Sequence, residues 1–217
     1  MLTIYGVYFS RATRPLWLLE ELGLPFHLEP VIQAYRLRDA DAADAPVNTR
    51  SAEFLAVNPM GSIPSMDDNG FVLHESLAIT LYLARKHGGD LSPKDVREEA
   101  SMIQWALFAA TSIETPALDI PKAIGDGTGT TAENKAKIEA CAKELVRPLD
   151  VLEAHLASND YVVGGRFTAA DINVAEILRY AQGHTPLFDA RPALKGWLET
   201  CQARPGFKAM WEKRMQE

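Results

Sequence analysis

Residues 63–87 read IPSMDDNGFVLHESLAITLYLARKH and hold the clearest local structural signals in the chain. Two short β-prone segments, 63–66 and 71–74, flank Asp67-Asp68-Asn69-Gly70, which is typical of a hairpin turn. A helix is expected to follow at once, from Ser76 to about His87. The segment therefore predicts a β-hairpin leading directly into a helix.

Upstream of this segment the sequence indicates a mixture of strands and helix. Leu2–Tyr5 is a short β-prone run, and Phe26–Ile32 is a second strand candidate. Residues 14–22 are helical, with Gly23 placed where a C-terminal cap belongs. Residues 33–50 show no period and are interpreted as a loop or irregular helix. The first 80 or so residues are thus predicted to form an α/β domain.

Downstream of Gly88-Gly89 the β signal fades and helices are predicted. They are expected at 93–113, beginning at Pro93, then at about 169–182 and 192–203. Between them, Thr115–Thr131 is rich in Gly and Pro and is interpreted as a loop. A further helix is predicted from apolar residues at steps of three and four, with Pro148 expected to kink or break it. These apolar residues are Ile138, Cys141, Ala142, Leu145, Leu149, Leu152 and Leu156.

Composition and charge argue against several classes of function. The 217 residues are 47% hydrophobic and 24% charged, which is typical of a folded protein. The formal charge of -7 argues against a nucleic-acid-binding surface. No targeting segment or membrane span is recognised, and no membrane association is expected. Cys141 and Cys201 are too few and too distant for a disulfide framework, so reduced thiols in the cytoplasm are expected.

Four motifs occur in an order and spacing that resemble cytosolic glutathione transferases over essentially the whole chain. They are Ser10-Arg-Ala-Thr-Arg14, Asn58-Pro-Met-Gly-Ser-Ile-Pro64, Leu73-His-Glu-Ser76 and Gly164-Gly-Arg-Phe-Thr-Ala-Ala-Asp171. The resemblance is to the serine-type lineage, phi/delta-like or bacterial. It implies a thioredoxin-like glutathione-binding domain at residues 1–84. An all-α helical bundle at 92–217 would form the site for the electrophilic substrate.

In serine-type transferases a serine followed four residues later by arginine activates the bound thiol, and Ser10 with Arg14 matches that pattern. Ser10 would donate a hydrogen bond to the thiolate rather than act as a nucleophile. Taken alone, a serine before a helix is most often only an N-cap. Tyr5 and Tyr8 are rivals, since other transferase classes use tyrosine. Pro15 requires the following helix to begin irregularly or beyond Ser10.

The resemblance also implies a glutathione-binding set. Pro64 would be a cis-proline that presents the backbone of Ile63 to the cysteinyl unit. The N-terminus of the helix at Ser76 would bind the γ-glutamyl carboxylate, and Glu75 would accept from the γ-glutamyl ammonium. Taken alone, Glu75-Ser76 is equally a helix cap. Arg50 would meet the glycyl carboxylate or remain a solvated charge, and Ser62 replaces the glutamine or lysine often found in relatives.

Met102, Trp105, Ala109 and Ile113 fall at helical spacing, and such a stripe is usually core packing. The resemblance implies that this helix also lines the electrophile site, with Phe9, Trp105, Phe108 and Ser112 as candidate residues. Thr168–Asp171 is a capping box with Phe167 and Ile172 as a hydrophobic staple, and its role is interpreted as folding. The five histidines, His27, His74, His87, His155 and His184, lack metal-ligand spacing, so no metal site is expected.

We therefore expect a glutathione S-transferase that attacks an apolar electrophile, with glutathione as co-substrate and no cofactor. A non-catalytic ligand-binding or protein-interaction member and a glutathione-dependent peroxidase remain alternatives. Thiol transfer is disfavoured because the first domain has no cysteine, and maleylacetoacetate isomerase because Phe9-Ser10-Arg11 does not match its motif. A homodimer is expected, with ionic contacts between two helices. The residues taken to make these contacts are Tyr82, Arg85, Lys86, Arg97, Glu98 and Glu99.

Overall fold

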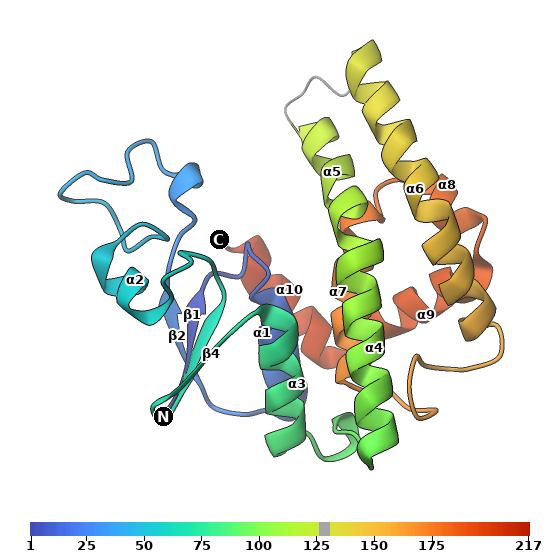
Figure 1. The fold of residues 1–217 in the computed structure, drawn as a ribbon, viewed down its shortest axis with the longest axis horizontal. Helices are drawn as coiled ribbons and strands as arrows, with labels where there is room; N and C mark the ends of the chain where they lie inside the picture. The colour runs from blue at the N-terminus through green and yellow to red at the C-terminus, as the bar shows by residue number, and fades with distance from the viewer. Residues whose placement is uncertain (126–130) are drawn as a thin grey trace. The chain divides into compact units, whose positions relative to one another are not determined.

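The computed structural model describes residues 1–125 and 131–217 (Figure 1). Two compact units divide the chain: Met1–Gly88 together with Arg204–Glu217, and Gly89–Ala203. The first unit contains a mixed sheet and helices, and the regular elements among the described residues of the second are all helices. The predicted order, an α/β domain followed by an all-helical domain, is confirmed.

The sheet of the first unit has four strands within the described residues, in the order β2-β1-β3-β4. Strand β1 pairs parallel to β2 and antiparallel to β3, and β3 pairs antiparallel to β4. Helices lie between β1 and β2 and between β2 and β3 along the chain, and α3 follows β4. The elements of the unit are β1 (Leu2–Gly6), α1 (Thr13–Leu22), β2 (His27–Pro30), η1 (Ala34–Arg36), α2 (Ala52–Val57), β3 (Ser65–Asp68), β4 (Phe71–His74), α3 (Ser76–His87) and α10 (Pro205–Met215).

The predicted hairpin is present because its turn residues adopt the required backbone. Asn69 and Gly70 have φ values of 54° and 92°, and the Gly70 N–H donates to Asp67 Oδ1 at 2.6 Å. Gly23 likewise ends α1 with φ 59°, in the left-handed region that glycine enters without a side-chain penalty. Helix α1 begins at Thr13, beyond Ser10, as Pro15 requires.

Helix α10 lies against α1 in the first unit. The rings of Trp17 and Phe207 meet edge to face at 4.9 Å, and Arg204 donates to the buried Glu21 carboxylate at 2.8 Å. A Cβ added to Gly206 would lie 2.8 Å from the Glu21 nitrogen, so glycine permits this close approach. The helical domain was expected to span 92–217, but the last 14 of these residues, 204–217, belong to the first unit.

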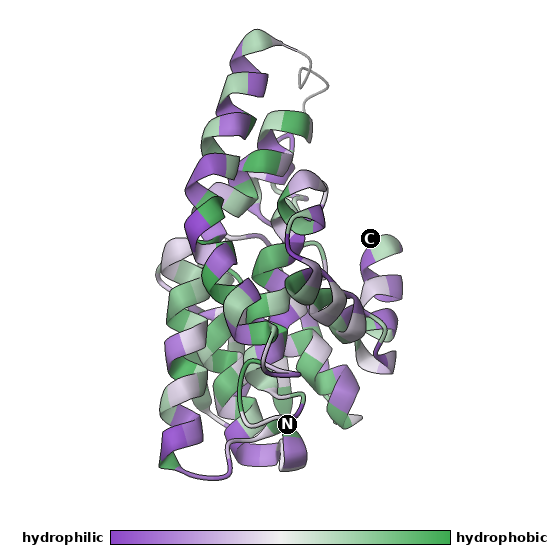
Figure 2. Ribbon diagram, turned by 90° about the vertical axis from the view of Figure 1, so that its right-hand side faces the viewer, coloured by the Kyte–Doolittle hydropathy of each residue, from purple (hydrophilic) through white to green (hydrophobic). Residues whose placement is uncertain are grey.

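The second unit consists of packed helices with a core of buried aliphatic residues. Figure 2 shows α6, which begins beyond the grey trace, as a largely hydrophilic helix with hydrophobic residues interspersed. Its buried residues are Cys141, Leu145, Leu149, Leu152 and Leu156, which belong to the predicted apolar face; the other two predicted members, Ile138 and Ala142, are half-buried. The elements are η2 (Gly89–Leu91), α4 (Val96–Ser112), α5 (Glu114–Gly125), α6 (Ala132–Leu156), α7 (Ala169–Leu178), η3 (Arg179–Ala181), α8 (Pro186–Asp189) and α9 (Pro192–Gln202).

Three sequence expectations for this unit are wrong. The loop expected at Thr115–Thr131 is helix α5 as far as Gly125, because Ala117, Ile120 and Ala123 form a buried stripe at three-residue spacing. Residues 126–130 of that expected loop lie outside the described residues. Pro148 does not break α6, which continues from Ala132 to Leu156, so of the expected kink or break the break is contradicted. Helix α4 begins at Val96 instead of Pro93.

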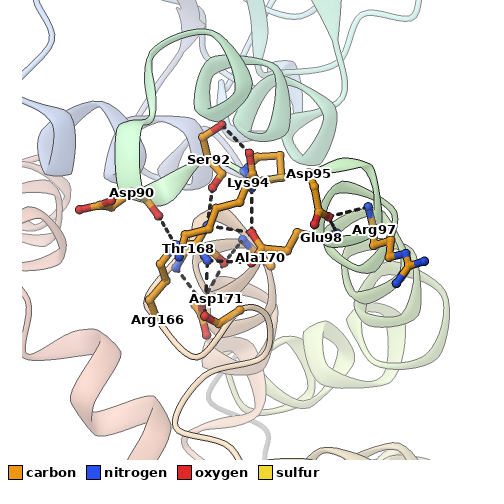
Figure 3. Close-up of polar contacts among 12 residues, drawn as sticks. Asp90, Ser92, Lys94, Asp95, Arg97, Glu98, Arg166, Thr168, Ala170 and Asp171 are labelled. Atoms are coloured by element: carbon orange, nitrogen blue, oxygen red, sulfur yellow. Dashed lines mark hydrogen bonds and ion pairs between the residues drawn. The ribbon is translucent and has the colours of Figure 1, made fainter.

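The start of α4 is set by Asp95, whose carboxylate accepts from the N–H groups of Arg97 and Glu98 at 2.8 and 2.9 Å. Figure 3 shows the junction beside this cap. Arg166 donates to both carboxylate oxygens of Glu98, at 3.0 and 2.8 Å, and to the carbonyls of Asp90 and Ser92, at 2.9 and 2.7 Å. The Arg166 guanidinium holds the pKa of Glu98 down, at about 2. The segment 89–95 is thereby fixed to the turn that precedes α7.

Candidate functional site

Ser10 lies in the turn between β1 and α1 and is half-buried. Its hydroxyl donates to the carbonyl of Val7 at 2.6 Å and accepts from the Ala12 N–H at 3.0 Å. The hydroxyl therefore closes the turn at the N-terminal end of α1, where backbone N–H groups and the helix dipole favour an anion. Because its one proton is directed at Val7, Ser10 must turn its hydroxyl to donate to a ligand.

The two rival tyrosines have other surroundings. Tyr8 is buried, and burial raises the pKa of its hydroxyl although the nearby charge of Lys213 acts to lower it. Tyr5 packs against Phe54 with ring centroids 6.4 Å apart, and burial followed by the charge of Asp67 raises its pKa. A raised phenol pKa makes each hydroxyl a weaker acid. Neither environment is one that prepares a tyrosine to stabilise an anion.

The segment from Asn58 to Ser65 forms a loop organised by one buried amide. Asn58 is 1% exposed, and its Nδ2 donates to the Ser62 carbonyl at 2.7 Å and to Ser65 Oγ at 3.1 Å. Gly61 has φ 57°, and a Cβ there would lie 2.5 Å from the carbonyl oxygen of Thr49. Glycine is therefore required at that position by both backbone conformation and space.

The peptide bond between Ile63 and Pro64 is cis, as expected. Pro64 is buried and Ile63 is half-buried at the entrance to β3. Ser62, the position where relatives often carry a longer polar residue, is exposed. Backbone groups of the loop that precedes β3 are thus held in one conformation.

Glu75 and Ser76 form the junction between β4 and α3. Glu75 is an exposed non-glycine residue with φ 68° and ψ 112°, an uncommon conformation that costs on the order of 1–3 kcal/mol and is typical of functional sites. Ser76 is the first residue of α3 and is 4% exposed. Its hydroxyl accepts from Nη1 of the buried Arg14 at 2.8 Å, which leaves the hydroxyl proton available for a ligand. The arrangement places a guanidinium beside a helix N-terminus.

Arg50 is exposed and pairs with the carboxylate of Asp41. It also begins the turn into α2, where its N–H donates to Asn48 Oδ1 at 2.9 Å. The side chain that was expected to meet a ligand carboxylate thus has an acidic partner on the surface. Such an exposed pair is weak, so a stronger anion can compete for the guanidinium.

The expected electrophile-site residues fall in both units. In the first, Phe9 is 50% exposed, with the guanidinium groups of Arg36 and Arg214 at 4.8 and 4.0 Å from its ring centroid. In the second, Trp105 is buried on α4 and contacts Phe108 edge to face at 5.4 Å. Ser112, the last residue of α4, is exposed.

His155 completes the aromatic cluster of the second unit. Its ring lies 4.8 Å from that of Trp105, and its Nε2 is 3.1 Å from the Val162 carbonyl. No sequence pattern connects this histidine with Trp105, because the two residues lie on different helices. Within the described residues no group of three histidine, cysteine or acidic side chains is arranged to hold a metal.

Asp171 is the buried centre of the predicted capping box, and the box is confirmed. Oδ1 accepts from the Val162 N–H and the Trp197 indole, both at 3.0 Å, and Oδ2 accepts from the Thr168 N–H at 2.8 Å. Burial raises the pKa of this carboxyl to about 6. Its oxygens are directed at the protein's own donors, which fits a folding role.

Comparison with known proteins identifies relatives over nearly the whole chain. Family models described as "Glutathione S-transferase, N-terminal domain" and "Glutathione S-transferase, C-terminal domain" match residues 9–86 and 99–205. Glutathione S-transferase 3 of Zea mays is 33% identical, over 95% of this chain and 91% of the relative.

Two solved structures extend the comparison to the fold. Glutathione transferase F7 of Populus trichocarpa is 28% identical with a TM-score of 0.81, covering 99% of both chains. Glutathione transferase URE2P6 of Phanerochaete chrysosporium, solved in complex with oxidized glutathione, is 26% identical with a TM-score of 0.78, covering 99% of this chain and 96% of that one.

Proposed function

Because the chain belongs to the glutathione S-transferase family, we propose that it conjugates glutathione to an apolar electrophile and that Ser10 stabilises the attacking thiolate. The protein is a glutathione transferase that takes glutathione as co-substrate. The assignment to the serine-type lineage, the roles of individual residues and the electrophile are the content of the proposal. Its basis is the arrangement of Ser10, Arg14 and Ser76 in the first unit.

The observation that carries the proposal is the hydrogen bond from Arg14 to Ser76, 2.8 Å long and buried. It joins α1, which follows Ser10, to the N-terminus of α3. The bond directs a positive charge toward the Ser76 hydroxyl, where the γ-glutamyl carboxylate of glutathione would bind. Glu75, exposed beside it, would accept from the γ-glutamyl ammonium. The cis peptide at Pro64 and the fixed loop before it would present the Ile63 backbone to the cysteinyl unit.

The energetics of Ser10 limit what it contributes. A thiol with an ordinary pKa near 8.5 needs about 2.7 kcal/mol of differential stabilisation to lower that pKa by two units. A hydrogen bond to a charged acceptor supplies about 1.5–3 kcal/mol, while the bond that Ser10 now makes to Val7 is worth about 0.5–1.5 kcal/mol. The net gain is about 1–1.5 kcal/mol, or about one pH unit. Other donors at the turn must supply the remainder.

A homodimer and a cytoplasmic location also form part of the proposal, on the basis of the family. The ionic contacts expected for the dimer need revision. Lys86 and Tyr82 bind the buried Asp68 of the same unit, and Glu98 binds Arg166. These groups are therefore engaged within their own units, and ionic pairing between subunits is no longer the reason to expect a dimer. None of the described helices is both long and apolar enough to cross a membrane.

The experiment is a comparison of wild type with Ser10→Ala, and with Ser158→Ala as an exposed control in the second unit. Turnover of a generic halogenated aromatic electrophile and glutathione affinity by calorimetry are measured from pH 5.5 to 9. Ser10→Ala is expected to keep glutathione affinity within about twofold and to raise the thiol pKa by about one unit. Wild type that neither binds glutathione nor turns over the electrophile would refute the function. If Ser10→Ala leaves turnover unchanged, a group other than Ser10 stabilises the thiolate.

A further inference from the structure

The last turn of α10 and the residues that follow it contact the turn that carries Ser10. Glu217 accepts hydrogen bonds from two consecutive N–H groups, that of Tyr8 at 2.9 Å through Oε1 and that of Phe9 at 2.8 Å through Oε2. One carboxylate therefore holds two adjacent peptide units through its two oxygens. Hydrogen bonds to a charged acceptor are about twice as strong as neutral ones.

Arg214 binds the same peptide from the other direction. Its Nη1 donates to the Tyr8 carbonyl at 2.5 Å, and its guanidinium lies 4.0 Å from the Phe9 ring centroid. Gln33 donates to the Phe9 carbonyl at 3.0 Å, and Arg36 also lies over that ring. The backbone polar groups of Tyr8 and Phe9 are thus bound by side chains. We name the pair Arg214 and Glu217 the α10 clamp.

The clamp lies immediately before the proposed catalytic hydroxyl. The Ser10 hydroxyl bonds to Val7 on one side of the clamped peptides and to Ala12 on the other. A shift of the Tyr8–Phe9 backbone would move both the Val7 carbonyl and the Ser10 Cα. A hydrogen-bond donor misplaced by about 1 Å can lose much of its catalytic contribution.

The clamp is itself anchored to the helix that Ser10 precedes. Besides the Trp17–Phe207 contact and the Arg204–Glu21 pair, Lys213 donates to the Glu20 carboxylate at 2.5 Å. These contacts hold α10 along α1. The clamp and the Ser10 turn are therefore both positioned relative to α1.

We propose that Arg214 and Glu217 are positioning residues that hold the Tyr8–Phe9 peptide and so place the Ser10 hydroxyl for the glutathione thiolate. The inference rests on the proposed role of Ser10. The two residues act through the backbone of the turn and contact no substrate. Neither belongs to the four sequence motifs, so the positioning role arises only from the folded chain.

A positioning role and a purely electrostatic role of Glu217 predict opposite shifts of the glutathione thiol pKa when Glu217 is replaced. Its negative charge near the turn disfavours a thiolate, so removing only that charge would lower the thiol pKa. Loss of positioning would instead raise the thiol pKa, because Ser10 would donate less well. Charged groups from every packed element face the turn: Arg36 of η1, Glu20 of α1, and Lys213 and Arg214 of α10. The sign of the shift therefore separates the two effects.

The test compares Glu217→Gln with Glu212→Gln, an exposed glutamate on α10 that gives the same change in charge. Hydrogen exchange of the Tyr8 and Phe9 amides reports the clamp, and ultraviolet titration of the enzyme-bound glutathione thiolate reports Ser10. Glu217→Gln is expected to speed exchange at these amides by about tenfold and to raise the thiol pKa by about half a unit. Glutathione affinity should stay within about twofold, and kcat/KM at pH 6.5 should fall about threefold. Glu212→Gln should change none of these.

Arg214→Lys gives an independent arm because it retains the positive charge. Lysine cannot both donate to the Tyr8 carbonyl and lie flat over the Phe9 ring, so the same upward shift in thiol pKa is expected. Melting curves of each variant confirm that it is folded.

A thiol pKa that falls in Glu217→Gln, or one that does not move while exchange accelerates, would overturn the positioning role and leave the function of Ser10 intact. Wild type without thiolate formation would overturn both proposals, so the two failures are distinguishable.

Discussion

Replacing Asp171 by alanine tests whether this carboxylate is more than a helix cap. The side chain is fully buried, and three N–H donors point at it: the backbone amides of Val162 and Thr168 and the indole of Trp197. Alanine would leave all three without an acceptor in a site that water does not reach. Each orphaned buried donor costs about 1–3 kcal/mol, so a total of about 3–5 kcal/mol is expected after partial relaxation.

The size of the stability loss distinguishes two roles for Asp171, a helix cap alone or an acceptor for three buried donors. Loss of a helix cap alone costs about 1 kcal/mol, which lowers Tm by about 2–4 °C in a chain of this size. Loss of the three-donor centre would lower Tm by about 10–15 °C. Urea unfolding at pH 7 and thermal melting measure the difference, with Asp160→Ala as an exposed control. Turnover per mole of folded protein should stay close to that of wild type.

A double-mutant cycle with Trp197→Phe makes the test specific. Phenylalanine removes the indole donor, so it should be nearly harmless in Asp171→Ala while it is costly in the wild-type background. Asp171→Asn retains the Oδ1 acceptor for Val162 and Trp197 and should lose about half as much stability as Asp171→Ala. If Asp171→Ala lowers Tm by less than about 4 °C, or if the two substitutions have additive effects, the carboxylate is only a helix cap.

Three further predictions concern other contacts. The pKa of Glu98 is lowered to about 2, so its stabilisation is complete above pH 4.5 and lost as the pH falls toward 2; the difference in urea stability between wild type and Glu98→Gln should shrink over that range. Gly61→Ala should destabilise by about 1–3 kcal/mol in thermal melts and weaken glutathione binding, because φ is 57° and a Cβ would clash with a backbone carbonyl. Asp41→Asn should tighten glutathione binding, measured by calorimetry, if Arg50 receives the glycyl carboxylate once released; unchanged affinity would remove Arg50 from the site.

Local signals in the sequence were sufficient for much of the fold. The hairpin turn at Asn69-Gly70 and the helix Ser76–His87 were predicted correctly because both depend on neighbouring residues. Helix α5 was missed because Pro116, Pro121 and the glycines outweighed its short buried stripe in the interpretation. Pro116 is tolerated because the first turn of a helix has no intrahelical acceptor for its N–H.

The same limit applies to the candidate site. The sequence motifs identified Ser10, Pro64 and Ser76, but they did not predict the long-range contacts that hold these residues in place. The bond between Arg14 and Ser76 spans 62 positions, and that between Phe9 and Glu217 spans 208. Contacts of such separation depend on how the elements pack, and no period in one segment encodes them. Helix α10 shows the same limit, since its packing partner α1 lies at the other end of the chain.

The resting hydrogen bond of Ser10 bears on how the thiolate is stabilised. A hydroxyl already bonded to Val7 contributes only the difference between a charged and a neutral acceptor, about one pH unit. The rest of a two-unit shift must come from groups that lose nothing when the ligand binds, and the dipole of α1, worth up to about 1 kcal/mol, supplies most of a further unit. A fixed dipole is effective only if the thiolate lies close to the first turn, and the geometry of the turn determines that distance. For this reason the side chains that hold the Tyr8–Phe9 peptide should affect the thiol pKa through both terms at once, the Ser10 donor and the α1 dipole.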